Sequence, residues 1–537
     1  MTRKSAYTCF HVLLTTLILA STASAQVPNP PILDGEIVEP PPPAPPPPGG
    51  ADVAIPGFTA VTTALDPTGN GTRYDVTPSD ELTVVPWQSL KPGDVVNIFY
   101  RPEPYRHKIL LSERGTAANP IVINGVTDAN GNRPTIDGAG ARTINPSHWH
   151  PAYRTTIILI NKSQVTGSYG VNAQHYVIKN LRITGARARN SFIHDGGSES
   201  YLDSSRGIWS AGGQEISLEG MIIEDNGSGI FIQAADDPGA LSKHWEIRGS
   251  KFENNGNGSR DHQIYFQAVS DPGRYNIVEG NYFGPATSTC VCAQLKTRST
   301  GVVIRYNYFE SAARTLDIVE AQDAIPEWMY RNYTAQNILD YYRSSHVYGN
   351  VINNEGAASR PLHFGADTLD HDATWGTGSR PNESAMRGDG SPTYFYYNSF
   401  RMNHGGYRGN LFDAENNNSN GPTPIPGTVE AWNNIFRFVG NSRIGVMNRS
   451  GTTLFRGANL LDTASLTIFA ESDAYANFEN PGDDPDVDVR YEGTIVTDPV
   501  GAAQPLPSYM HPVEFQPNGQ IGGTIERVST NDIGAVE

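Results

Sequence analysis

Residues 292–309 read CAQLKTRSTGVVIRYNYF, and this stretch decides the fold. A run with polar residues at alternate positions leads into an apolar run, 302–304, which ends at a bend around Asn307. The same order of a short apolar run and a bend recurs along the chain. The equivalent bend positions, spaced 25 to 48 residues apart, are Asn180, Gly220, Ser250, Asn281, Asn307, Asn350, Asn398, Asn434 and Asn459.

A minimum spacing near 25 residues with irregular excess above it is typical of a solenoid, in which each coil is one unit and insertions form loops. The apolar runs are short, rich in Val, Ile, Tyr and Phe, and bounded by Gly and Asn, which indicates strands. Asn and Gly suit the bends because they tolerate left-handed backbone angles. The sequence therefore predicts an all-β, single-domain parallel β-helix, right-handed as parallel crossovers generally are.

The N-terminal residues are not expected to belong to this fold. Residues 1–25 have a positive start, an apolar centre and small residues at 23–25, which is the pattern of a secretory signal peptide. Residues 26–50 are rich in proline and predict an extended linker. We assign residues 51–537 to the β-helix and expect a secreted or periplasmic protein.

Composition limits the partners. The formal net charge is −17, and it becomes −19 once Arg3 and Lys4 leave with the signal peptide, which argues against nucleic acid and anionic membranes as partners. We also expect no membrane insertion. Of the three cysteines, Cys9 lies in the signal peptide. Cys290 and Cys292 are so close in sequence that we interpret them as two small thiols near a strand, not as a metal or redox site. We expect a monomer.

Five strands that follow the bends of the central coils are expected to be neighbours in one parallel sheet. They are 229–233, 263–267, 293–298, 316–320 and 362–364. Alternation divides their side chains into an inward apolar set and an outward polar set. The outward set contains Tyr265, Gln267, Gln294, Lys296, Arg298, Asp317 and His363. This polar row is either an acid/base site or the solvated face of a solenoid.

Two long insertions follow these strands, between Asn307 and Asn350 and between Asn350 and Asn398. Long loops on a rigid scaffold often carry binding surfaces, and aromatic side chains suit stacking on sugar rings, although they can equally pack on the solenoid. The residues expected to bind substrate, from the polar row and the insertions, are Gln267, Gln294, Glu320, Trp328, Tyr330 and Trp375.

No metal-ligand set is predicted from the sequence. Asp236 and Asp237 pair two carboxylates but precede a Pro-Gly turn. The acidic residues between 483 and 488 lack the glycine spacing of a calcium loop. His148 and His150 have no carboxylate or cysteine nearby in sequence, so we predict no zinc site.

Both ends of the β-helix region contain short motifs of a known group. Segments 90–94 (LKPGD), 119–121 (NPI) and 532–537 (DIGAVE) resemble the start and end of many pectate-lyase-like right-handed β-helix proteins. Together with the coil pattern, the resemblance covers most of residues 85–537. It implies carbohydrate as the usual ligand and does not fix the reaction.

Uronic-acid polysaccharides are cleaved by β-elimination when a base removes the C5 proton, a cation neutralises the neighbouring carboxylate and a donor protonates the leaving oxygen. The polar row contains residues of each type. We expect Lys296 as the base, Arg298 or Arg305 as the carboxylate clamp, and Tyr265 or His363 as the proton donor.

Residues 295–298 and 304–309 also resemble the catalytic segment of the chondroitinase B and alginate lyase group. In that group a lysine on this strand is the base, which corresponds to Lys296, and an arginine of a Leu-Arg-His-Gly motif supports it. Here that place, 318–321, reads IVEA, so the calcium dependence of the group is not carried over. The HQIY segment at 262–265, followed by LKTR, is more similar to a further set of secreted β-helix proteins.

Three hypotheses of function follow. The favoured one is a lyase, or the related C5 epimerase, acting on a uronic-acid polysaccharide. The second is a glycoside hydrolase that uses carboxylates such as Asp317, Glu320 and Asp236. The third is a non-catalytic carbohydrate-binding protein displayed on its proline-rich linker. No cofactor is assigned, and calcium stays open.

Overall fold

The computed structural model describes most of the region assigned to the β-helix. The described residues are 63–165, 173–234, 241–271, 274–299, 301–310, 312–319, 345–355, 362–366, 393–403, 408–416, 428–439, 443–449, 452–456, 458–461, 488–491, 494–496, 505–507, 510–513, 515–517 and 524–526. The predicted signal peptide and proline-rich linker lie outside the described residues, so the domain boundaries stay predictions.

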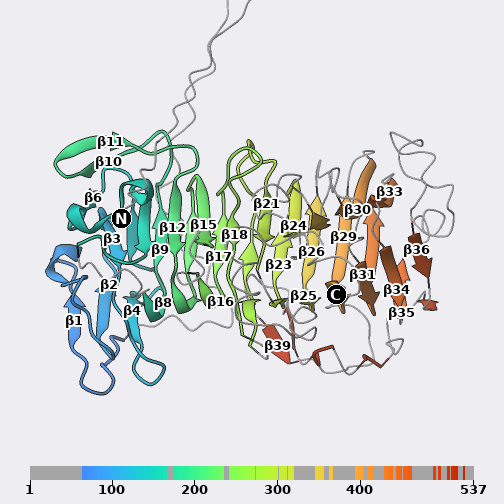
Figure 1. The fold of residues 1–537 in the computed structure, drawn as a ribbon, viewed down its shortest axis with the longest axis horizontal. Helices are drawn as coiled ribbons and strands as arrows, with labels where there is room; N and C mark the ends of the chain where they lie inside the picture. Colours follow the sequence, from blue (N-terminus) through green and yellow to red (C-terminus); the bar gives the residue numbers. More distant parts are fainter. Residues whose placement is uncertain are drawn as a thin grey trace, which may run out of the picture. The chain divides into compact units, whose positions relative to one another are not determined.

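The described strands form three long sheets and one short one (Figure 1). The first sheet contains, in order, β1 (Arg73–Val76), β2 (Val95–Phe99), β4 (Ile121–Val126), β8 (Gln174–Lys179), β13 (Gln214–Glu219), β16 (Lys243–Arg248), β19 (Asn276–Glu279), β22 (Val302–Arg305), β25 (Ser345–Tyr348), β28 (Thr393–Tyr396), β31 (Thr428–Trp432), β34 (Thr452–Arg456) and β36 (Asp488–Tyr491). The second sheet contains β11 (Gly197–Ser200), β10 (Ser191–His194), β6 (Arg142–Thr143), β3 (His107–Leu111), β7 (Thr156–Ile160), β12 (Arg206–Ala211), β15 (Ser228–Gln233), β18 (Ile264–Phe266), β21 (Ala293–Thr297), β24 (Arg314–Val319), β27 (Leu362–Ala366), β30 (Arg408–Asn416) and β33 (Arg443–Arg449).

The third sheet contains β37 (Thr494–Val496), β35 (Ala458–Leu461), β32 (Ile435–Val439), β29 (Ser399–Asn403), β26 (Val351–Glu355), β23 (Tyr308–Glu310), β20 (Tyr282–Phe283), β17 (Lys251–Glu253), β14 (Ile222–Glu224), β9 (Arg182–Thr184) and β5 (Thr135–Asp137). The short sheet pairs β38 (Phe515–Pro517) with β39 (Thr524–Glu526). The helical elements among the described residues are the short 3₁₀ turns η1 (Leu82–Val84), η2 (Pro146–His148) and η3 (Pro151–Tyr153). None of the described helices is long and apolar enough to cross a membrane.

Each central coil contributes one strand to each of the three long sheets. β22 of the first sheet leads through the Asn307 bend to β23 of the third sheet, and β24 of the second sheet follows. The next coil repeats this order with β25, β26 and β27, whose strands pair in parallel with those of the coil before. The predicted all-β parallel β-helix is confirmed, and its strands stand side by side in Figure 1.

Buried asparagine side chains connect successive coils at the bends. The Asn307 amide oxygen accepts hydrogen bonds from the backbone N–H and the side-chain amide of Asn281 at 2.9 and 3.0 Å. The Asn307 amide donates in turn to the carbonyl of Val278 and to the amide oxygen of Asn350. The pattern continues through Asn350, Asn398, Asn434 and Asn459. The predicted contact between Asn281 and Asn307 is therefore confirmed.

The left-handed backbone angle at these bends belongs to the residue before the asparagine. Gly280 and Tyr306 have φ values of 62° and 58°. Asn180 and Gly220 take the left-handed angle themselves, at 56° and 58°, so the predicted alignment is one residue early in those two coils. The later asparagines are required for their amide hydrogen bonds and not, as we expected, for their tolerance of positive φ.

Asn307→Ala is expected to lower the free energy of unfolding by about 1 to 3 kcal/mol, because it leaves buried partners in both neighbouring coils without their hydrogen bonds. The midpoint of urea unfolding measures the change. Asn130→Ala, at an exposed turn position, is the matched control and should leave the midpoint unchanged. Equal midpoints for both variants would contradict the prediction.

Residues 510–513 pack on the outer face of the first sheet. Met510 is buried in the same aromatic cluster as Tyr396, whose hydroxyl accepts a hydrogen bond from the His511 backbone N–H. The His511 ring stacks on the His346 ring with centroids 4.2 Å apart. Burial lowers the pKa of His346 to about 3 and also lowers the pKa of His511. Both imidazoles are therefore neutral at neutral pH.

Acidification is expected to destabilise this stacked pair. His346 binds a proton more readily in the unfolded chain, where its pKa is 6.5, so its contribution to stability is complete above pH 6.5 and is lost as the pH falls toward 3. Near pH 5 the loss is about 2 kcal/mol. Thermal melting near pH 7 and pH 5 measures it, and His346→Phe should lose less stability than the wild type. The same loss in both proteins would contradict this.

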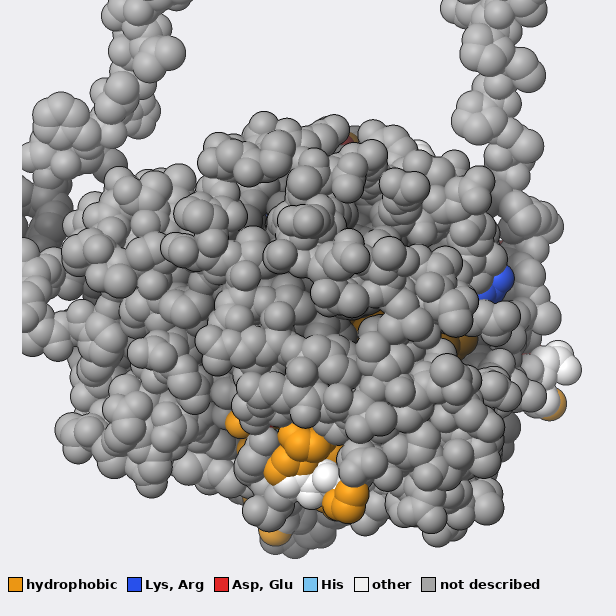
Figure 2. Space-filling view, turned by 90° about the vertical axis from the view of Figure 1, so that its right-hand side faces the viewer, with side chains coloured by type: hydrophobic (Ala, Val, Ile, Leu, Met, Phe, Trp, Pro, Cys, Tyr) orange, Lys and Arg blue, Asp and Glu red, His pale blue; other side chains and the backbone are white. Residues whose placement is uncertain are grey.

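The interior between the sheets is apolar. Ile264, Leu295 and Leu316 are fully buried at matching positions of neighbouring strands, as predicted. Phe283 stacks on Phe309 with ring centroids 4.6 Å apart. Figure 2 shows the side that is on the right of Figure 1, where a small patch of described hydrophobic side chains reaches the surface. Stacked apolar side chains thus extend the core from coil to coil.

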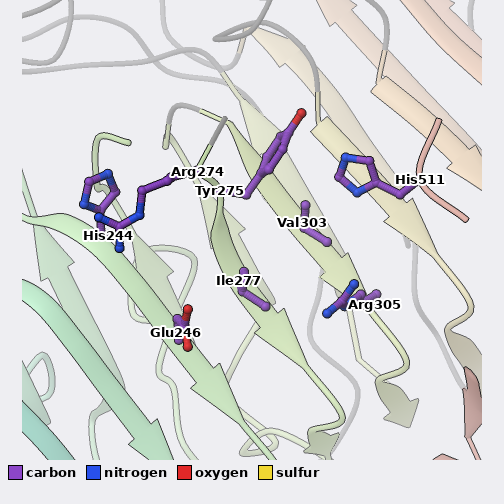
Figure 3. Close-up of a pocket in the computed structure, with 8 residues that line it drawn as sticks. All are labelled: His244, Glu246, Arg274, Tyr275, Ile277, Val303, Arg305 and His511. Carbon is purple, nitrogen blue, oxygen red and sulfur yellow. The ribbon is translucent and has the colours of Figure 1, made fainter. Parts of the chain in front are cut away.

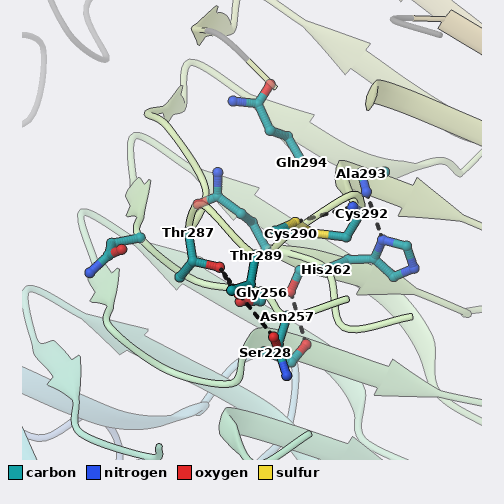
Figure 4. The surroundings of a disulfide bond; sticks show 12 residues. Ser228, Gly256, Asn257, His262, Thr287, Thr289, Cys290, Cys292, Ala293 and Gln294 are labelled. Atoms are coloured by element: carbon teal, nitrogen blue, oxygen red, sulfur yellow. Dashed lines mark hydrogen bonds between the residues drawn. A yellow bond between two sulfur atoms is a disulfide. The ribbon is translucent and has the colours of Figure 1, made fainter. Parts of the chain in front are cut away.

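Cys290 and Cys292 form a disulfide with Cα atoms 5.0 Å apart (Figure 4). Our interpretation of two unbridged thiols is therefore wrong. The pair precedes β21, and Val291 between the cysteines projects outward with 59% exposure, so the chain turns here and brings the two residues closer than a strand would. A Cβ at Gly256, where φ is +96°, would lie 2.7 Å from the Cys292 sulfur, so the bridge packs where only glycine fits.

Candidate functional site

Four polar residues of the second sheet lie in one row across successive coils. Tyr265 on β18 pairs in register with Lys296 on β21, which pairs with Asp317 on β24, which pairs with His363 on β27. We call these four residues the polar ladder. The sequence predicted this register, because the bends set the start of each strand and alternation sets the face.

Asp317 joins the lysine and the histidine of the polar ladder. Its carboxylate lies 3.1 Å from the Lys296 ammonium and 2.5 Å from Nδ1 of His363. Arg314, at the start of the same strand, lies 3.6 Å from the carboxylate. Burial raises the pKa of Asp317, but Lys296 and His363 outweigh it and hold the pKa well below its usual range. Asp317 is therefore an anion shared between two cationic or proton-bearing side chains.

The polar ladder is largely removed from solvent. The side chains of Asp317 and His363 are 0% and 1% exposed, and that of Lys296 is 8% exposed. Tyr265 is partly exposed. The alternative interpretation as a solvated face is therefore wrong, since burying charged groups is costly unless they are paired. Among the four residues of the ladder, Tyr265 is the most exposed.

Tyr265 and Arg298 form a second polar pair beside the lysine. The Arg298 Nε–H donates to the Tyr265 hydroxyl at 2.8 Å. The Lys296 ammonium lies 5.8 Å from the centre of the Tyr265 ring. The Gln267 amide also donates to the Tyr265 hydroxyl, at 3.4 Å. A phenol that accepts two such hydrogen bonds is assisted in releasing its proton, because both donors favour the phenolate.

The two glutamines expected to bind substrate are buried. The Gln294 amide donates to the backbone carbonyls of Phe283, Gly284 and Glu310, so it ties the second sheet to the third. Gln267 accepts from the backbone N–H of Ala234 as well as reaching Tyr265. These contacts give both residues structural roles within the fold.

Arg305 lies on a different sheet from the polar ladder. It ends β22 of the first sheet, where its guanidinium pairs with Glu279 at 2.7 Å and donates to the Tyr348 hydroxyl at 2.8 Å. The alternative of Arg305 as a carboxylate clamp beside Lys296 does not fit this placement. The sequence could not show that Arg305 lies apart from Lys296, because the turn after Arg298 carries the chain from the second sheet to the first.

Arg305 instead borders a cavity of about 280 Å³ on the outer face of the first sheet (Figure 3). The other lining residues are His244, Glu246, Arg274, Tyr275, Ile277, Val303 and His511. Arg274 is bonded to Glu215, which also accepts from His244. The charges around this cavity therefore neutralise one another.

Several predicted site residues lie outside the described residues: Glu320, Trp328, Tyr330, Trp375, Asp236 and Asp237. The acidic turn between 483 and 488 lies mostly outside them as well. His148 contacts the Ser163 hydroxyl and His150 accepts from Ala152. Within the described part of the chain, no group of three His, Cys, Asp or Glu side chains is arranged to hold a metal ion.

A row of aromatic side chains, which we did not predict from the sequence, extends the polar ladder toward the N-terminus. Trp209 on β12 pairs in register with Phe231 on β15, and Phe231 pairs with Tyr265. Ring centroids are 5.6 Å apart for the first pair and 5.0 Å for the second, which is stacked. The alternation that placed Tyr265 outward would also have placed Trp209 and Phe231 outward, so the signal was present.

No family model and no curated protein matches the sequence. Solved structures are similar in architecture. An alginate lyase from Paenibacillus sp. is 15% identical with a TM-score of 0.34, over 67% of this chain and 94% of that chain. The pectate lyase Pel9A is 11% identical with a TM-score of 0.39, over 89% and 100%.

A lacto-N-biosidase from Eubacterium ramulus is 13% identical with a TM-score of 0.36, over 79% of this chain and 67% of that chain. At such identities and TM-scores the likeness concerns the fold alone. The parallel β-helix is shown by the three long sheets themselves, and the reaction has to be argued from the site.

Proposed function

We propose that this protein is a polysaccharide lyase that cleaves a uronic-acid-containing polymer by β-elimination. The observation that supports this most is the meeting, on adjacent strands, of the Tyr265–Arg298 pair and the Lys296–Asp317 ion pair. Together they supply a proton-transferring group, on the partly exposed Tyr265, and a cation on the adjacent strand. The predicted signal peptide is consistent with action outside the cytoplasm, and we propose that the enzyme works as a monomer.

Tyr265 is assigned the proton transfer. The Arg298 hydrogen bond stabilises its phenolate, which removes the C5 proton of the uronate. The phenol formed in this step then donates its proton to the oxygen of the breaking glycosidic bond, so Tyr265 ends the cycle as it began. Tyr265 is partly exposed, so a polymer can contact its side chain.

Lys296 is assigned the neutralisation of the substrate carboxylate. An adjacent carboxylate favours the charged form of a lysine, and Asp317 lies 3.1 Å away. A cation near the uronate carboxylate stabilises the negative charge that develops when the C5 proton leaves. This role differs from our expectation that Lys296 is the base. Asp317 and His363 act as positioning residues, since they hold the lysine in place from the next coils.

Hydrolysis by paired carboxyl groups fits the described site less well. A glycosidase needs one carboxyl group that is protonated to act as the general acid. Asp317 is the one carboxyl group in the polar ladder, and its pKa is held well below its usual range, so it stays ionised. The geometry therefore favours elimination.

Incubation with polymannuronate, polyguluronate, polygalacturonate and chondroitin tests the proposal. Elimination produces an unsaturated uronate with new ultraviolet absorbance, and at least one polymer should show it. New reducing ends without that absorbance would indicate hydrolysis. Exchange of the C5 hydrogen with solvent without chain cleavage would indicate epimerisation. Binding of a polymer without any turnover would indicate a non-catalytic carbohydrate-binding protein.

The Lys296→Arg variant tests whether Lys296 acts as a cation or as a base in the proposed reaction. If Lys296 serves as a cation, the arginine variant keeps measurable elimination, and Lys296→Met loses it. An arginine stays protonated at working pH and cannot accept a proton, so a folded Lys296→Arg variant with no activity would return the base role to Lys296. Initial rates of both variants, with circular dichroism as the check on folding, decide between the roles.

A further inference from the structure

Arg206 has a mostly buried guanidinium. It makes no side-chain hydrogen bond or ion pair with any residue that the structure describes, and its Nε is buried without an acceptor. Burial lowers the pKa of Arg206 to about 10, and the field of Asp261 opposes that effect only in part. Burying a cation in this way costs free energy unless an anion pairs with it.

The guanidinium lies directly on the aromatic row. Its central carbon is 3.9 Å from the centre of the Trp209 ring and 4.8 Å from that of Phe231. These cation–π contacts hold the guanidinium over the aromatic rings. The Trp209 Nε1–H donates to Gln233, which fixes the ring beneath the guanidinium. Arg206 is therefore preorganised, and its terminal N–H groups are left to a ligand.

The aromatic row leads straight to the proposed reaction site. Phe231 and Tyr265 are both partly exposed and stacked, and Tyr265 is the register partner of Lys296. Neighbouring strands are about 4.8 Å apart, so Phe231 lies about two strand spacings from Lys296. A saccharide chain bound at Tyr265 and running along the coils toward the N-terminus would cross Phe231 and reach Arg206.

We propose that Arg206, Trp209 and Phe231 form a remote subsite that binds a further uronate residue of the same polysaccharide chain. The sugar ring lies against the partly exposed side chain of Phe231, and its carboxylate receives hydrogen bonds from the Arg206 guanidinium. This inference rests on the proposed function for its ligand class. It adds that the enzyme recognises acidic sugars on the N-terminal side of the reaction site, through a cation that an aromatic surface positions.

Binding is measured separately from turnover by calorimetric titration in a Tyr265→Phe background, which keeps the aromatic ring. The probes are short oligosaccharides of mannuronate, guluronate and galacturonate, a neutral cello-oligosaccharide and a sulfated galactan oligosaccharide. Arg206→Gln should weaken binding of the preferred uronate about 10- to 100-fold, the range for a charge-assisted hydrogen bond. Phe231→Ala should weaken it as well.

Arg101→Gln is the matched control. Its guanidinium also lies 3.9 Å over an aromatic ring, that of Tyr105, but it is already paired with Glu81 and belongs to a different part of the fold. It should leave every affinity unchanged. Arg206→Lys keeps the charge without the planar fork, so it should fall between the wild type and Arg206→Gln, and melting curves confirm that each variant is folded.

The outcomes separate this subsite from the reaction itself. If the wild-type protein produces unsaturated uronates, but Arg206→Gln binds the uronate oligosaccharides as tightly as its Tyr265→Phe parent, the subsite is wrong and the lyase stands. If binding depends on Arg206 but no polymer is cleaved, the subsite stands and the lyase falls. If no uronate binds, or only the sulfated oligosaccharide depends on Arg206, the subsite as proposed is overturned.

Discussion

Tyr265→Phe is expected to reduce the rate of β-elimination about 10²- to 10⁴-fold, the usual contribution of a positioned proton-transfer group. The substitution removes only the hydroxyl that Arg298 and Gln267 contact, and it leaves the ring stacked on Phe231. The substrate affinity should therefore change little, because the lost interaction belongs to the transition state. Ultraviolet assays of kcat and KM on the preferred uronate measure the effect.

The matched control for this variant is Tyr275→Phe. Tyr275 lies beside the cavity on the first sheet, where its ring contacts His346 edge to face, and it has no part in the proposed reaction. It should keep full activity. If Tyr265→Phe is also fully active, the proton transfer belongs to another group, and His363, the other predicted donor, is the next residue to replace.

Asp317→Ala is expected to lower the free energy of unfolding by about 3 to 5 kcal/mol, because it leaves the buried Lys296 ammonium without its counter-ion. The His363 imidazole loses its 2.5 Å partner in the same step. Activity should be lost too, since the lysine is no longer held beside Tyr265. The midpoint of urea unfolding followed by circular dichroism measures the stability change.

A surface ion pair provides the comparison for Asp317. Asp66 lies 2.9 Å from Arg73, and its side chain is 85% exposed. Exposed pairs contribute about 0 to 1 kcal/mol, so Asp66→Ala should be nearly neutral. If the two alanine variants unfold at the same midpoint, the Lys296–Asp317 pair is not the buried junction that the structure shows.

The sequence alone was enough to predict the β-helix and the register of the polar ladder. Bends near Asn281 and Asn307 set where each strand starts, and the two-residue period of a strand then decides which side chains point outward. Those two local rules placed Tyr265, Lys296 and Asp317 in one row, and the structure has them in register. The same rules would have found Phe231.

Only the tertiary structure decided what surrounds that row. Burial of Asp317, the hydrogen bond from Arg298 to Tyr265 and the place of Arg305 on another sheet all depend on how a coil turns in three dimensions. The disulfide likewise depends on a turn at Val291.

Periodicity reports the face of a strand, whereas partners and exposure depend on groups that lie far apart in sequence. Arg206 shows this most clearly. In the sequence, Arg206 marks only the start of a strand. Its proposed binding role depends on the rings of Trp209 and Phe231, which the parallel stacking of coils places next to its guanidinium.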